Sequence, residues 1–183
     1  MESSVSAVHT FGQRIWRAAR LEPAIYEEVE ADKSATGQAL VVVILSSIAA
    51  ALGLGMSGPS APGRLLFGLL AALGGWVTWA VLIYWVGARW FPEPQTQSDV
   101  GELLRTVGFA NSPGLLRALG VFVGMQQIVF VAVNVWLLIS TVIAVRQALD
   151  YRSTWRAIGV CCWGWAVQLL LVAAVWIFFG YSA

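Results

Sequence analysis

The sequence predicts an all-α integral membrane protein, a bundle of five transmembrane helices with a short amphipathic N-terminal cytoplasmic segment. Of its 183 residues, 58% are hydrophobic and only 11% are charged, whereas soluble domains carry about 25% charged residues. So few charges cannot cover a water-facing surface, and most of the outer surface must therefore face lipid. Long uncharged runs also alternate with short polar segments that carry the arginines.

Residues 1–36 are predicted to form a cytoplasmic amphipathic tail. From Thr10 to Leu21, apolar and basic residues recur at helical period, with Phe11 and Ile15 on one face and the arginines on the other. This pattern is typical of a helix that lies in the headgroup layer, where arginines meet anionic lipid. The alternative is a helix packed on the cytoplasmic face of the protein itself.

An acidic block follows the basic helix. Pro23 is well placed in a first helical turn and predicts a second helix that ends near Asp32. Its carboxylates either form salt links to the preceding arginines or make a docking surface for a partner. Carboxylates without histidine suit calcium or magnesium, but EF-hand spacing is absent, and we expect no metal or cofactor. The candidate partner-binding residues are Arg14, Arg17, Arg20, Tyr26, Glu27, Glu28, Glu30 and Asp32.

Residues 37–183 are predicted to form one membrane domain. A helix of roughly 20 apolar residues crosses about 30 Å of hydrocarbon. The uncharged run from Ala118 to Val145 would be about 42 Å long as a single helix, which is too long without strong tilt. A turn at Met125–Gln127 divides it, and the third span then begins before Pro113. The predicted spans are residues 37–57, 64–88, 107–124, 127–145 and 157–179.

The distribution of charge supports five crossings. With the N-terminus in the cytoplasm, nine of the 11 basic residues lie on the cytoplasmic side, while Arg64 lies outside and Arg117 within the membrane. This arrangement follows the positive-inside rule. Four crossings would instead place the arginines of residues 146–156 outside. We therefore expect a cytoplasmic N-terminus and a C-terminus on the outside.

Polar residues at membrane depth form a further candidate site, namely Arg117, Asn134 and Gln168. A charge at the centre of a bilayer costs about 2.5–3.5 kcal/mol on insertion scales. Arg117 therefore either extends along the helix surface to water or headgroups, or is held by polar groups such as Asn134 and lines a cavity.

Three segments resemble the Yip1-domain family, and the resemblance extends over nearly the whole chain. They are YEEVEAD at residues 26–32, LLRTVGFANSPGLL at residues 103–116 and AVRQALDYRSTWRAI at residues 144–158. The family motif of an arginine, a glycine, an aromatic, a small residue and a proline matches Arg105, Gly108, Phe109, Ala110 and Pro113. The resemblance implies five helices, a cytoplasmic N-terminus and no enzymatic activity. The short tail is similar to that of bacterial members, which implies the bacterial cytoplasmic membrane as the location.

The sequence contains no catalytic constellation, since it lacks HExxH and a nucleophile beside a base, and His9 is its only histidine. We therefore expect a non-enzymatic membrane scaffold, a membrane-organising factor or an accessory subunit of a membrane complex. The expected partners are the lipid bilayer and either a membrane protein or a second copy of the chain, with no nucleic acid. The alternative is a small transporter or channel for an anionic solute, with Arg117 as the binding group.

Overall fold

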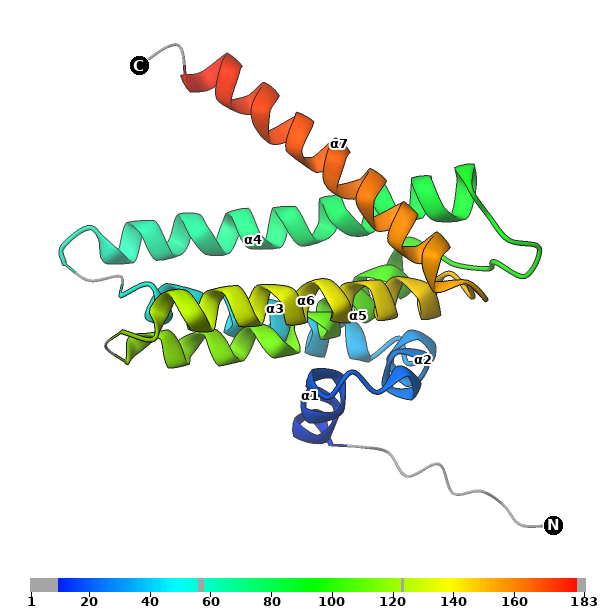
Figure 1. The fold of residues 1–183 in the computed structure, drawn as a ribbon, viewed down its shortest axis with the longest axis horizontal. Helices are drawn as coiled ribbons and strands as arrows, with labels where there is room; N and C mark the ends of the chain where they lie inside the picture. Colours follow the sequence, from blue (N-terminus) through cyan, green and yellow to red (C-terminus); the bar gives the residue numbers. More distant parts are fainter. Residues whose placement is uncertain (1–9, 56–57, 123, 181–183) are drawn as a thin grey trace.

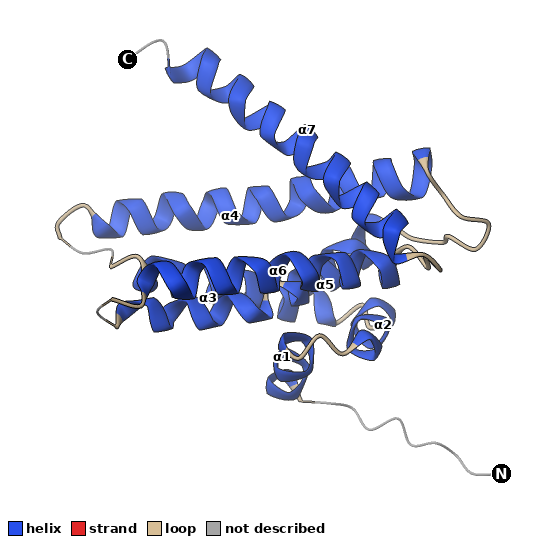
Figure 2. Cartoon of the chain, in the orientation of Figure 1, coloured by secondary structure: helices blue, strands red, loops and turns tan. Residues whose placement is uncertain are grey.

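The computed structural model describes residues 10–55, 58–122 and 124–180. Within this part of the chain, all regular secondary structure is helical (Figure 2). The α-helices are α1 (Phe11–Ala19), α2 (Pro23–Ala31), α3 (Ala35–Gly53), α4 (Ala61–Ile83), α5 (Val100–Ala110), α6 (Gln126–Ala148) and α7 (Thr154–Gly180). A π-helix, η1 (Tyr84–Trp90), continues α4, and a 3-10 helix, η2 (Ser112–Val121), follows α5.

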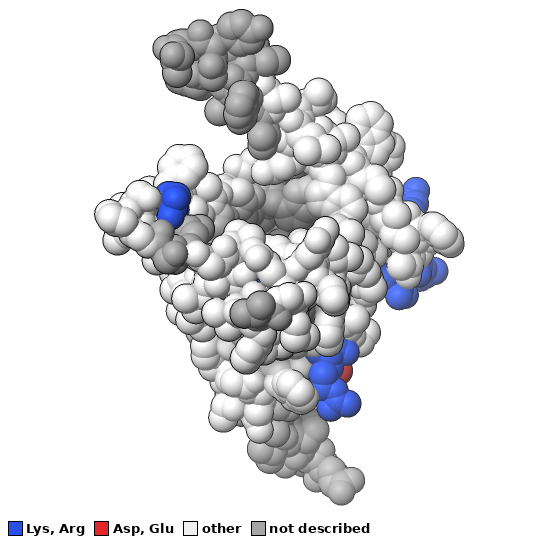
Figure 3. All heavy atoms as spheres, turned by 60° about the vertical axis from the view of Figure 1, so that its left-hand side comes forward, with Lys and Arg blue, Asp and Glu red and all other residues white. Residues whose placement is uncertain are grey.

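Three of the described helices are long and apolar enough to cross a membrane: α3, α4 together with η1, and α6. Large apolar side chains lie exposed along them, for example Phe67 at 76% and Ile128 at 68%. On the face shown in Figure 3, charged side chains gather in a few places near the edge, and most of the described surface between them is uncharged. The chain is therefore a multi-pass membrane protein that contacts the bilayer directly.

Helices occupy four of the five residue ranges predicted as spans, with shifted ends. Residues 37–57 overlap α3, 64–88 run from α4 into η1, 127–145 lie within α6 and 157–179 lie within α7. The predicted third span, 107–124, is not one α-helix, because it holds the end of α5 and all of η2. Pro113 lacks an N–H and clashes with a preceding α-helical turn, so the chain continues in the tighter 3-10 form.

Helix α3 packs closely against η2 and also contacts α5 (Figure 1). Three glycines six residues apart on α5 and η2 face three small residues seven residues apart on α3. These are Gly108, Gly114 and Gly120 opposite Ala39, Ser46 and Gly53. Gly114 and Gly120 lie in the 3-10 helix, where three residues per turn place residues six apart on one face. Residues seven apart share a face of an α-helix. The two repeats therefore stay in register along the contact.

The other helices are arranged around this pair (Figure 1). In the view of Figure 1, α4 runs above α3 and α6, and α7 crosses α4 and then diverges from the bundle. The crossing is held by stacked rings of Trp79 and Trp165, whose centroids are 5.7 Å apart. Helices α1 and α2 lie below the bundle, beside α5 and α6. The contacts of α1 and α2 with the bundle decide which of the N-terminal candidate residues are buried and which stay exposed.

Candidate functional site

Helix α1 packs on the protein itself, which is the second of the two interpretations of its sequence. Arg14 is buried, and its Nε and Nη1 lie 3.0 Å from Glu28 and 2.8 Å from Asp32. Arg17 forms ion pairs with Glu22 and Glu28. Hydrogen bonds from Ser34, followed by the bond from Arg14, hold the pKa of Asp32 below its usual value. The expected salt links between the basic and acidic blocks are thus present.

Tyr26 of α2, a candidate partner-binding residue, is fully buried and is not on the surface. Its hydroxyl lies 2.8 Å from the Ser140 hydroxyl of α6, and burial raises the pKa of Tyr26 to about 12. Tyr26 therefore anchors α2 to the bundle. Of the predicted set, Arg20 and Glu27 are exposed, Arg17, Glu28, Glu30 and Asp32 are partly buried, and Arg14 and Tyr26 are buried.

The residues of the arginine–glycine–aromatic motif are all buried, and they connect α1 and α2 to the bundle. Arg105 donates from Nε to the carbonyl oxygens of Val29 and Glu30, each at 3.0 Å. These carbonyls belong to the last turn of α2, where backbone acceptors lack helical partners and a cation is favoured. The ring of Phe109 meets Phe11 of α1 edge to face at 6.4 Å, and Gly108 touches Ala39. Ala110 and Pro113 complete the buried motif.

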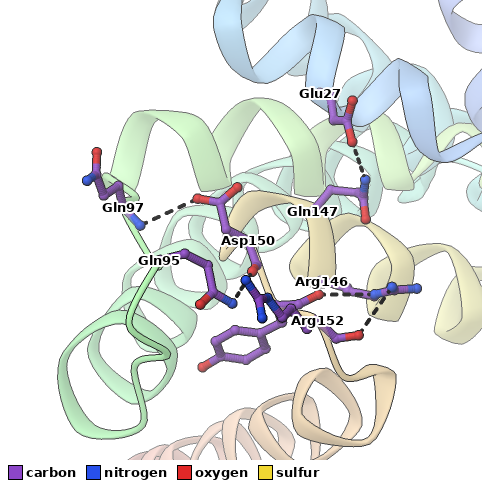
Figure 4. A pocket seen from close by; sticks show the side chains of 8 residues that line it. Glu27, Gln95, Gln97, Arg146, Gln147, Asp150 and Arg152 are labelled. Atoms are coloured by element: carbon purple, nitrogen blue, oxygen red, sulfur yellow. Dashed lines mark hydrogen bonds between the residues drawn. The ribbon is translucent and has the colours of Figure 1, made fainter.

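A polar pocket of about 540 Å³ opens beside α2 (Figure 4). Four segments contribute to it: α2, the loop between η1 and α5, the end of α6, and the loop before α7. Its lining residues are Glu27, Gln95, Gln97, Arg146, Gln147, Asp150, Tyr151 and Arg152. Gln147 donates to Glu27 at 2.7 Å, and Arg146 donates to the carbonyls of Tyr151 and Arg152 at 3.2 and 3.3 Å. The pocket therefore presents charges of both signs on a hydrogen-bonded frame.

The two loops at the pocket are tied to each other and to η1. The Tyr151 hydroxyl lies 2.9 Å from the carbonyl oxygens of both Gly87 and Phe91. Thr96 donates to the Leu149 carbonyl at 2.9 Å. The backbone N–H of Arg152 is the main cause of a lowered pKa at Glu93. Sequence reasoning placed the partner site on α1 and α2 and missed these loops, although charged and amide side chains gather in both.

Glu30 gives this end of the molecule an expected dependence on pH. Burial, and then the negative charges of Glu102 and Asp150, raise the pKa of Glu30 from 4.5 to about 7. The folded state therefore binds this proton more tightly than the unfolded state, so the associated stability is present below pH 4.5 and is lost as the pH rises to about 7.

We expect thermal stability in detergent to fall between pH 5 and 7.5 in the wild-type protein, following the titration range of Glu30. The variant Glu30→Gln carries no ionisable group and is expected to show a flatter profile. Glu27→Gln, which alters an exposed carboxylate of the same helix, should keep the wild-type slope. An unchanged slope in Glu30→Gln would exclude Glu30 as the source of the dependence.

Arg117 lies within the bundle and is held there. Its Nη2 donates to Asn134 of α6 at 2.6 Å, and its guanidinium lies 5.5 Å from the centre of the Phe130 ring. The side chain lines a cavity of about 300 Å³ together with residues of α3, α4 and α7. The structure thus brings Arg117 and Asn134 together and favours the held arginine over one that extends to the surface. Gln168 lies on α7, one turn beyond the cavity residue Trp165.

Comparison with known proteins gives the family. The family model described as the Yip1 domain matches residues 22–177. The chain belongs to the Yip1 family. The Yip1 domain thus begins just before α2 and extends into the last turn of α7, and it contains the buried motif, the polar pocket and Arg117. No curated protein and no solved structure matches the chain.

Proposed function

We propose that this Yip1-domain protein is a non-enzymatic membrane scaffold or accessory subunit that holds a membrane protein partner at the polar pocket beside α2. The pocket carries the proposal, because it is open and combines exposed Glu27 and Arg152 with amide side chains. Polar and charged groups of both signs select partners by complementarity rather than by apolar burial alone. The frame of hydrogen bonds around Arg146 keeps these groups in place before a partner binds.

The proposed topology has five crossings, with the polar pocket in the cytoplasm of a bacterial cell and the C-terminus outside. The third crossing is the predicted span 107–124, which holds the last turn of α5 and all of η2. At about 1.5 Å per residue in an α-helix and 2.0 Å in a 3-10 helix, the ten residues of η2 extend about 20 Å and residues 107–110 of α5 about 6 Å. Together they approach the roughly 30 Å of hydrocarbon in a bilayer, and α7 supplies the fifth crossing with 27 residues. The arginines at residues 146–156 then lie on the same side as α1 and α2.

The test is co-purification from native membranes in a mild detergent, with the tagged full-length chain. We expect a stoichiometric membrane protein partner to be recovered with the wild-type protein. The double variant Glu27→Lys with Arg152→Glu reverses two exposed charges at the pocket and is expected to lose most of that partner. Arg64→Glu, an exposed charge at the opposite end of α4, is the matched control and should retain it.

The folding of each variant must be measured, because a misfolded chain would also fail to bind its partner. Equal yield and an equal melting temperature of the variants show that the fold is intact. A strictly monomeric wild-type protein without a partner in native membranes would contradict the proposal. Equal recovery of the partner with the double variant would retain the scaffold role but remove the pocket as its site.

A further inference from the structure

Two cavities meet at Arg117 and form one groove between α3 and α4. The first has a volume of about 300 Å³ and the second about 240 Å³. Ser47, Ala72 and Arg117 line both of them. Along α3 the groove runs from Val43 to Leu54, which is about 16 Å at 1.5 Å per residue. Arg117 therefore lies near the middle of an elongated groove rather than in an isolated pocket.

The groove is polar at one end and apolar at the other. The half nearer α5 contains Ser46, Asn111 and Thr141 beside tryptophans of α4 and α7. The other half is lined by Ala50, Ala51, Leu54, Leu65 and Leu69. The order along the groove is thus polar groups, then a cation, then an apolar channel. This order matches an amphiphile with an anionic group between its polar head and its hydrocarbon chain.

Arg117 has a donor available for such an anion. Its Nη2 is bonded to Asn134, but its Nε is buried and has no hydrogen-bond partner among the described residues. A buried donor without an acceptor costs about 1–3 kcal/mol. Bonds from an ionised donor to an anionic oxygen are among the stronger hydrogen bonds in proteins. Because Nε has almost no accessible surface, a phosphate oxygen would reach it after a small rotation of the side chain and would then supply the missing acceptor.

Glycines of α4 leave the room that an occupant needs. A Cβ atom added at Gly68 or Gly75, which line the groove, would meet no atom within 4 Å. Ala71 and Gly75 are two small residues four apart, a pattern typical of close contact between membrane helices. Here the lack of a side chain at Gly75 instead leaves open space. Leu66 and Leu70, on the neighbouring surface of α4, are exposed. The groove thus adjoins a surface that faces lipid hydrocarbon.

The polar half lies at the depth of α1. Asn111 lines the groove, while the next residue, Ser112, lines a hollow against α1 together with exposed Trp16. Trp136 donates to the Ala19 carbonyl at 2.8 Å at the same level. Tryptophan side chains are enriched at the membrane–water boundary. The polar end of the groove is therefore near the headgroups of the leaflet on the α1 side, and its apolar end points to the opposite side of the membrane.

We propose that this groove binds one anionic phospholipid from the leaflet on the α1 side. The phosphate accepts a hydrogen bond from Arg117 Nε, the headgroup occupies the polar half, and an acyl chain lies along the apolar half. The lipid enters sideways between α3 and α4. This site is independent of the polar pocket beside α2.

The test is native mass spectrometry of the full-length protein released from detergent after incubation with phosphatidylglycerol or phosphatidylcholine. We expect one tightly retained phosphatidylglycerol per chain and about tenfold weaker retention of phosphatidylcholine. Arg117→Gln removes the cation and is expected to weaken retention about tenfold, equivalent to the loss of one charge-assisted bond. Gly75→Leu fills the groove and is expected to weaken retention to a similar extent by excluding the lipid. The matched controls are Gly74→Leu, at the exposed residue beside Gly75, and Arg89→Gln, at an exposed arginine of η1 away from the groove; both should bind as wild type.

The proposal would be overturned if Arg117→Gln and Gly75→Leu retained the lipid as well as the wild type, or if the two control variants lost it as much as these variants do. It would also be overturned by equal retention of phosphatidylglycerol and phosphatidylcholine, or by displacement of the lipid by millimolar inorganic phosphate. The last result would indicate a site for a soluble anion, and flux of that anion in liposomes would then support transport through Arg117. Melting temperatures measured without added lipid separate a loss of binding from a loss of folding. The two variants act through charge and through volume, so agreement between them locates the lipid in this groove.

Discussion

The substitution Gly53→Ala is expected to destabilise the protein by about 3 kcal/mol or more. A Cβ atom at this position would overlap the carbonyl oxygen of Arg117 and lie 3.3 Å from the Phe130 ring. The first neighbour is backbone, which cannot rotate away, so α3 and η2 would have to separate. The measurement is the thermal unfolding midpoint in detergent, together with the yield of monodisperse protein.

Gly75→Ala is the matched control for this substitution. A Cβ atom there meets nothing within 4 Å, and alanine favours a helix over glycine by about 0.8–1.0 kcal/mol. We therefore expect an unchanged or slightly raised midpoint. A midpoint for Gly53→Ala within a degree of the wild-type value would show that α3 and η2 leave room for a Cβ atom at this position.

The substitution Arg105→Ala is expected to release α1 and α2 from the bundle while α3, α4 and α6 stay folded. The side chain is 6% exposed and supplies bonds to the last carbonyls of α2. Hydrogen bonds from a charged donor contribute about 1.5–3 kcal/mol. Amide hydrogen exchange in α2 should therefore accelerate by roughly one to two orders of magnitude, with little change in α6. Limited proteolysis between α2 and α3 should accelerate as well.

Arg20→Ala provides the comparison for Arg105. Its side chain is 63% exposed, and its ion-pair contact with Glu22 is at 3.9 Å, a weak arrangement on a solvent-exposed surface. We expect wild-type exchange rates in α2. If Arg105→Ala instead unfolded the whole chain, the N-terminal helices would be part of the core rather than a docked unit.

Much of the fold follows from local sequence signals. The capping box at Asp99 and Glu102 begins α5 as the spacing indicates, and Pro23 begins α2. The apolar runs gave α3, α4 and α6 to within a few residues, because length and hydropathy alone determine such helices. The salt links between α1 and α2 were one of two interpretations, because a helical wheel shows which face of a helix is basic but not which groups that face contacts.

The 3-10 helix could not be expected from hydropathy, which is insensitive to the number of residues per turn. A signal was nevertheless present, because Gly108, Asn111, Gly114, Arg117 and Gly120 recur at intervals of three, the period of that helix. The polar pocket was missed for another reason. Its residues come from four segments that are distant in sequence, such as Glu27 and Gln147, and only tertiary packing brings them together.

The period of three in η2 restricts how its length can change. One extra residue would turn everything downstream by about 120°, since each residue of a 3-10 helix advances a third of a turn. An insertion between Gly114 and Arg117 would thus rotate Gly120 away from Gly53 and swing the arginine off Asn134. Three added residues would restore both orientations at the cost of about 6 Å of displacement along the axis. Length variation among homologous chains is therefore expected in the loops that flank η2, and within η2 only in steps of three.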